Sequence, residues 1–141
     1  MMSRRMLSGL ACTGFAILAL GCSSKSNQGL LPGAVYAASA VQVYRNAELT
    51  NVMGSDQYGD EPDSHIQGQT WFLKVKDPKE KVLAFYAQQF PNAERTTNED
   101  GSVTFRILPQ GAEPGEDVHV TVADGEIRIG ENCKPGKIKS Q

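Results

Sequence analysis

Acidic side chains and one histidine crowd a single stretch of the sequence, and their types suit the binding of a metal ion. The stretch 54–69 is rich in Gly, Asp, Ser and Pro, and its candidate ligands are Asp56, Asp60, Glu61, Asp63 and His65. Hard cations such as Ca²⁺ take several oxygen ligands. The spacing lacks the alternating acids and the final glutamate of a calcium loop. We therefore expect a long solvated loop without metal or other cofactor, with ion or small-molecule binding as the alternative.

His65 and His119 are the only histidines in the chain. Nucleophilic catalysis needs a nucleophile, a base and an orienting group in contact. His65 belongs to the acidic stretch, and His119 is expected on the solvent face of a strand. The pattern assigns no third group to a pair of His119 and Cys133. We expect no catalytic residue and a protein that is not an enzyme.

The first residues have the pattern of an export signal. Arg4 and Arg5 precede an uncharged run of 15 residues from Met6 to Leu20. A positive segment before an apolar one is typical of a signal peptide, whereas a permanent membrane helix needs about 20 apolar residues. The opening Ser3-Arg4-Arg5-Met6-Leu7 also resembles a twin-arginine signal, so the export route stays open. We expect residues 1–21 to be removed.

The apolar run ends at Ala19-Leu20-Gly21-Cys22, which resembles a relaxed form of the lipobox of bacterial lipoprotein precursors. The resemblance implies that the Cys22 thiol receives diacylglycerol and that the new amino terminus is acylated, for example with palmitate. Cys12 is the competing acceptor, but cleavage there would leave the apolar segment 15–20 on the mature chain. Ser23 follows Cys22 where Asp would indicate inner-membrane retention. The resemblance therefore implies an outer-membrane lipoprotein that faces the periplasm.

Composition divides the chain into four parts. These are a signal peptide (1–21), a flexible tether (22–33), one α+β domain (34–133) and a basic tail (134–141). Without Arg4 and Arg5, the mature chain keeps 12 of 14 Lys and Arg against 16 Asp and Glu, a formal charge near −4 that does not favour nucleic acid. Cys133 would be its only free thiol. We expect a disordered tail, with weak attraction of its lysines to anionic lipid as the alternative.

The clearest element is a helix predicted over about 78–90. Asp77 can cap its first turn with Glu80 reaching back, Pro78 suits the first helical position, and Pro91 prevents continuation. An apolar stripe that should dock on a sheet is formed by Val82, Leu83, Tyr86 and Phe90. Aromatic residues in helices and strands are usually core, so we expect core packing rather than a ligand groove for Trp71, Phe85 and Tyr86.

Alternating apolar residues and turn signals predict a sheet. Expected strands are 41–44, 48–53, 71–76, 94–97, 102–108, 117–123 and 126–130, although 37–40 could start a helical turn. Asp100-Gly101 and Asp124-Gly125 predict two tight hairpins. The fold class is therefore α+β, with a small, mostly antiparallel sheet, one buried and one wet face, and the main helix packed on one face.

Two further segments carry a second resemblance. Val43-Tyr44-Arg45-Asn46-Ala47-Glu48, then Asp77-Pro78-Lys79-Glu80-Lys81-Val82 with Phe85-Tyr86, resemble small bacterial envelope proteins that have a VYPGA segment followed by D-x-P-E-K-V-x-x-F-Y. Here Arg45-Asn46 stands where Pro-Gly is usual. The resemblance implies an α+β fold and supplies no catalytic residue. The lipid tether, the small two-layer fold and the absence of a site lead us to expect a lipid-anchored, non-enzymatic interaction or structural module with an envelope protein as partner. The alternative is a small-molecule or ion-binding module that uses the 54–69 stretch.

Overall fold

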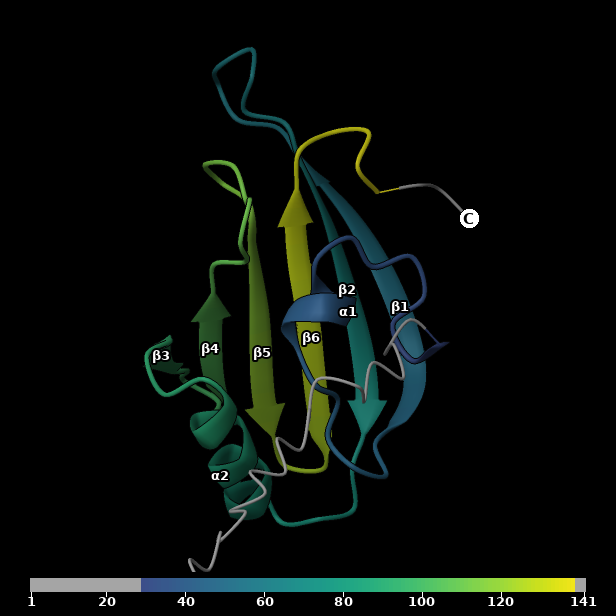
Figure 1. Ribbon diagram of the computed structural model, residues 1–141, viewed down its shortest axis with the longest axis vertical. Helices are drawn as coiled ribbons and strands as arrows, with labels where there is room; N and C mark the ends of the chain where they lie inside the picture. The colour runs from purple at the N-terminus through teal and green to yellow at the C-terminus, as the bar shows by residue number, and fades with distance from the viewer. Residues whose placement is uncertain (1–28, 139–141) are drawn as a thin grey trace, which may run out of the picture.

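The computed structural model describes residues 29–138 and shows a six-stranded antiparallel sheet with two helices (Figure 1). In chain order the elements are α1 (Ala37–Ala40), β1 (Glu48–Gln57), β2 (Ile66–Lys74), α2 (Lys79–Gln89), β3 (Glu94–Thr97), β4 (Val103–Ile107), β5 (Asp117–Ala123) and β6 (Glu126–Cys133). This mixed but sheet-dominated architecture agrees with the expected α+β class. The predicted signal peptide (1–21), Cys22 and residues 139–141 lie outside the described residues.

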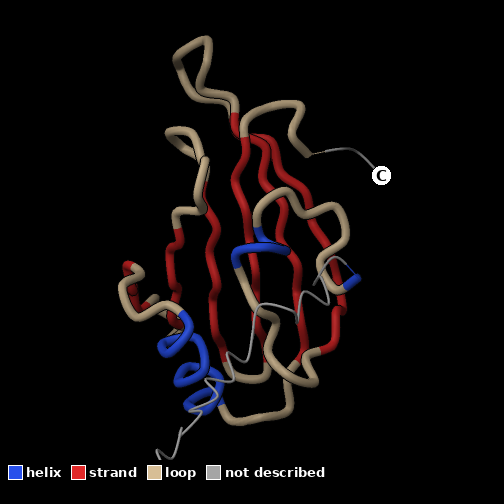
Figure 2. Tube along the Cα trace, viewed as in Figure 1, coloured by secondary structure: helices blue, strands red, loops and turns tan. Residues whose placement is uncertain are grey.

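The strands lie in the order β1-β2-β6-β5-β4-β3. The β1–β2 hairpin joins the β3–β6 meander through β6, where Ile129 lies opposite Trp71 of β2. The α2 segment carries the chain from β2 to the far edge strand, β3. Figure 2 shows the strands as one curved layer, with β1 and β3 as its two edges. Among the described helices, none is long and apolar enough to cross a bilayer.

One face of the sheet holds the core. Side chains alternate between the two faces of a strand, and β5 shows this clearly, because Val118, Val120 and Val122 are fully buried while His119 and Thr121 are only half-buried. The other main core residues of the sheet are Trp71, Leu73, Val103, Phe105, Ile127 and Ile129. The predicted alternation in the last two strands is confirmed, as are both hairpins, where Gly101 and Gly125 adopt φ values of 81° and 72°.

The helix α2 begins at Lys79, and its N-cap, Pro78, makes no side-chain cap. The predicted cap by Asp77 is wrong because its carboxylate accepts a hydrogen bond from the Tyr44 hydroxyl at 2.6 Å. That bond, with Lys81 3.6 Å away, holds the pKa of Asp77 below its usual range. Of the predicted stripe, Val82 and Tyr86 are fully buried, and Leu83 and Phe90 are partly buried against the same cluster.

The segment before β1 contributes to the core without being a strand. The alternative helical turn at 37–40 is confirmed, and the predicted strand at 41–44 is wrong. Figure 1 shows α1 lying across the middle of the sheet, where it contacts β6. The Glu131 carboxylate of β6, which is 1% exposed, accepts hydrogen bonds at 2.8–2.9 Å from the backbone N–H groups of Val35, Tyr36 and Ala37. A carboxylate on the buried face therefore anchors this segment.

The predictions of a flexible tether (22–33) and a disordered tail (134–141) are both partly wrong. Leu31 is fully buried, and the Trp71 indole N–H donates to the Pro32 carbonyl oxygen at 3.1 Å, so the predicted tether is packed from position 31. At the other end, the Gly136 N–H donates to the Gln67 side chain at 3.1 Å. The predicted disorder of the tail is therefore wrong for residues 134–137, which bond to the domain through backbone and side-chain groups.

Candidate functional site

The structure brings together only two of the five residues expected in an acidic loop. His65 Nε2 lies 2.9 Å from Asp56 Oδ1, and the His65 ring stacks on Tyr58 with 4.2 Å between ring centroids. Asp60, Glu61 and Asp63 lie in the exposed turn between β1 and β2. Within residues 29–138, no group of three His, Cys, Asp or Glu side chains is arranged to hold a metal ion.

The stretch 54–69 is not one long loop, so that prediction is wrong. Strand pairing continues from Gly54 opposite Gln69 to Gln57 opposite Ile66, which leaves only residues 58–65 as a turn. Ladder hydrogen bonds join backbone groups and do not require apolar side chains, so a polar sequence can still pair as a hairpin. Figure 1 shows this hairpin extending beyond the ends of the other strands.

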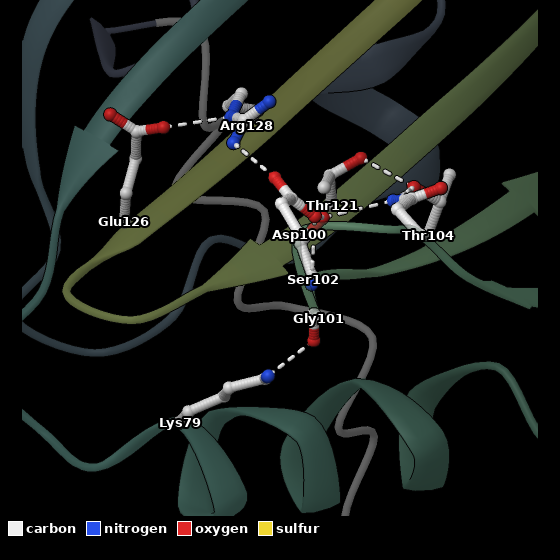
Figure 3. A network of polar contacts seen from close by, with 9 residues as sticks. Lys79, Asp100, Gly101, Ser102, Thr104, Thr121, Glu126 and Arg128 are labelled. Carbon is white, nitrogen blue, oxygen red and sulfur yellow. Dashed lines mark hydrogen bonds and ion pairs between the residues drawn. The ribbon is translucent and has the colours of Figure 1, made fainter.

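A polar network joins the β3–β4 turn to the less buried sheet face (Figure 3). The Asp100 carboxylate accepts from the Ser102 hydroxyl at 2.6 Å and from the Ser102 N–H at 2.9 Å. These two bonds hold the pKa of Asp100 below its usual range. The Asn98 amide donates to the hydroxyl oxygens of Ser102 and Thr104 at 2.9 Å. These hydrogen bonds stabilise the β3–β4 turn, and the carboxylate of Asp100 is an acceptor in two of them.

Two cations complete this network. Arg128 donates to Glu126 at 2.7 Å, and one of its terminal nitrogens lies 3.9 Å from Asp100 (Figure 3). The Lys79 ammonium donates to the Gly101 carbonyl oxygen and so ties the start of α2 to the β3–β4 turn. Arg128 is therefore paired with two carboxylates, and Lys79 is bonded to a backbone carbonyl oxygen of the turn.

A second polar cluster on the same sheet face surrounds Asp117, which is 7% exposed. Its carboxylate accepts from Arg106 Nε and the Asn132 amide at 2.9 Å each, and His119 Nε2 lies 3.1 Å away. The bond with Asp117, supported by Glu94, raises the pKa of Arg106. The predicted position of His119 on this face is confirmed. Its partners were not predicted from the sequence, although the strand register across β4, β5 and β6 would have indicated them.

A buried carboxylate that no sequence pattern predicted lies where the domain meets its C-terminal segment. Glu116 is 1% exposed and accepts from Lys137 Nζ at 2.7 Å, the Lys134 N–H at 2.9 Å, the Glu113 N–H at 2.9 Å and the Tyr36 hydroxyl at 3.1 Å. Burial by itself would raise the pKa of Glu116, but these hydrogen bonds outweigh it and lower the pKa to about 2. The group is therefore ionised and structural.

Acid should weaken the contacts between Glu116 and the C-terminal segment over a defined pH range. The folded-state pKa of Glu116 is about 2 against an ordinary 4.5, so its contribution to stability is complete above pH 4.5 and lost as the pH falls towards 2. Lys137→Met removes the main partner and should make the free energy of unfolding less dependent on pH across that window. Urea unfolding at several pH values checks this. An unchanged pH dependence in the variant would contradict the assignment.

Cys133 is fully buried, so its thiol should be inert in the folded protein. Burial, and then the negative charges of Glu131 and Glu116, raise its pKa to about 12. The thiolate is the reactive form, so iodoacetamide at pH 8 should leave Cys133 unmodified in the native mature chain and modify it readily in urea. Mass spectrometry after timed labelling measures both rates. Comparable rates in the two conditions would show an accessible thiol.

A mainly apolar hollow of about 440 Å³ lies between the end of α2 and the outer strands β3 and β4. It is lined by residues 90–94 and 106–108, and one of them, Leu108, is 68% exposed. No residue of the 54–69 stretch lines it. The hollow and the predicted ion-binding stretch are therefore separate features.

Comparisons with protein-family models, with curated proteins and with solved structures find no match to this chain. The polar clusters of the described residues have their charged groups paired internally, while the projecting β1–β2 hairpin presents exposed acidic and aromatic side chains.

Proposed function

We propose that the protein is a lipid-anchored, non-enzymatic interaction module of the bacterial envelope, held by Cys22 in the outer membrane and facing the periplasm. The proposal rests on the short stretch of chain between the lipobox-like segment and the first buried residue of the domain. Leu31, which is fully buried, stands only nine positions after Cys22 in the sequence. A lipid on Cys22 would therefore tether the domain itself, because little chain separates the two.

The length of this junction limits how far the domain can lie from the bilayer. A fully extended chain spans about 3.5 Å per residue, so nine residues reach about 30 Å at most. A flexible coil of that length averages roughly 17 Å from end to end. Such a tether suits a module that meets its partner close to the membrane surface.

The distribution of polar groups supports an interaction role rather than catalysis. We take α2 and the segment 31–47 to form one layer over the core face, which leaves the opposite face and the edge β1 for partners. Asp117 and Glu116 are each held by several donors within the domain. Carboxylates held in this way stabilise a surface and have little freedom to exchange protons with a substrate.

The proposal is tested by capture of the tagged protein from cells whose envelopes have been mildly crosslinked. Cys22→Ala should stay unlipidated, and Cys12→Ala serves as the matched control because its lipid acceptor is intact. We expect the same specific envelope protein to be enriched with the wild type and with Cys12→Ala, and not with Cys22→Ala. Equal enrichment with all three forms would contradict a role for the lipid in the interaction.

A further inference from the structure

The strand β1 forms an outer edge of the sheet, and among the described residues no strand pairs with its outer side. It is ten residues long and mostly exposed. Edge strands carry unpaired backbone groups, and proteins commonly guard them with lysine, proline or very short length. β1 contains no lysine or proline, and its pairing with β2 is irregular only near Thr50. Most of the edge is therefore open to another strand.

The outward-pointing backbone groups can be identified from one hydrogen bond. The Val52 N–H donates at 2.9 Å to the Asn51 side chain, so it faces away from β2. Because these directions alternate along an antiparallel strand, the N–H groups of Gly54 and Asp56 also point outward. Gly54 is exposed, and a Cβ there would meet only the Gly68 carbonyl oxygen at 3.9 Å. Gly54 therefore has no side chain that could hinder a partner strand.

The edge and its turn are strongly acidic. The chain from position 46 to position 73 contains no Lys or Arg but includes Glu48, Asp56, Asp60, Glu61 and Asp63. Tyr58, in the turn, is 76% exposed and presents an aromatic ring, which can attract a cation. A second copy paired antiparallel around Val52 would place Glu48 opposite Asp56, and like charges in that position are destabilising. The edge therefore suits a cationic partner.

We propose that β1 binds an extended, cationic segment of another protein by strand addition. The backbone of the segment pairs with the outward groups of Gly54 and Asp56 and with the carbonyl oxygen of Val52, whose N–H is already bonded to Asn51. The Lys or Arg side chains of the segment face the acidic residues of the hairpin. This inference rests on the proposed function and deepens it by naming the class of partner. Because the attraction is electrostatic at an exposed site, added salt should weaken binding.

The test uses the full mature protein in non-ionic detergent and blocked eight-residue peptides. One peptide alternates lysine with threonine, and its matched control alternates glutamate with threonine. Fluorescence anisotropy, corrected for binding to empty micelles, should show that only the lysine peptide binds. Gly54→Pro removes one outward N–H and should weaken binding about tenfold, whereas Gly54→Ala should stay within about twofold of wild type.

A lysine peptide that is N-methylated on its pairing amides tests the same contact without altering the protein, and it should also bind about tenfold more weakly. The proposal is overturned if the lysine peptide fails to bind at millimolar concentration, or if the glutamate peptide binds equally well. It is also overturned if the methylated peptide binds like its parent. These outcomes do not depend on lipidation of Cys22, so failure here is distinct from failure of the membrane anchor.

Discussion

Replacing Glu131 with alanine should lower the free energy of unfolding by roughly 3 to 5 kcal/mol. The Glu131 carboxylate accepts three backbone N–H groups, those of Val35, Tyr36 and Ala37, at 2.8–2.9 Å. The substitution leaves these donors, which lie in a partly buried segment, without their acceptor. We therefore expect the segment before β1 to loosen first, with faster amide hydrogen exchange at positions 35–37.

Urea unfolding followed by the fluorescence of Trp71, the only tryptophan and fully buried, measures the effect. Glu126→Ala is the matched control because Glu126 lies on the same strand, with a side chain that is 40% exposed and paired with Arg128. Glu126→Ala should lower the free energy of unfolding by less than about 1 kcal/mol. If the two variants lose the same stability, the carboxylate of Glu131 does not anchor the segment.

Replacing Cys22 with alanine should abolish lipid attachment. The thiol of Cys22 is the proposed acceptor of diacylglycerol, and a methyl side chain cannot form the thioether. Acyl chains supply about 0.8 kcal/mol of membrane affinity per buried methylene, so we expect the proposed anchor to dominate how the mature chain associates with the bilayer. In cells fed a clickable palmitate analogue, we expect labelling of the wild type and none of Cys22→Ala.

Cys12→Ala controls for the loss of any cysteine from the first 22 residues, and its labelling should equal that of the wild type. The Cys22→Ala chain should also keep residues 1–21, which increases its mass on a denaturing gel. Labelling that disappears with Cys12→Ala and persists with Cys22→Ala would move the acceptor to Cys12. Unchanged labelling in both variants would show that neither cysteine is the acceptor.

Local patterns predicted much of the fold. The alternation in β5 and β6 and the Asp-Gly turns set strands and hairpins through interactions between neighbours in the sequence. The apolar stripe of α2 was also predicted from residues close together in the sequence, and two of its residues, Val82 and Tyr86, are fully buried. These features depend on backbone periodicity, which a sequence displays directly.

The contacts that were missed depend on residues far apart in the sequence. Glu131 alternates in step with Ile127 and Ile129, so the strand pattern could have placed it on the buried face. Its hydrogen-bond partners could not be predicted, because they lie about a hundred positions earlier in the sequence. Similarly, Lys137 was predicted in a solvated tail because its partner, Glu116, belongs to another segment, 21 positions earlier in the sequence. Polar residues between 54 and 57 also suggested a loop, although backbone pairing alone extends β1.

The proposed lipid anchor is tested most directly by the intact mass of the wild-type protein purified from membranes, followed by fragmentation of its first peptide. We expect a chain that begins at Cys22 and carries a diacylglyceryl group on sulfur with an acyl group on its amino terminus. A chain that begins at another residue, or an unmodified Cys22 thiol, would contradict the anchor on which the proposed function depends.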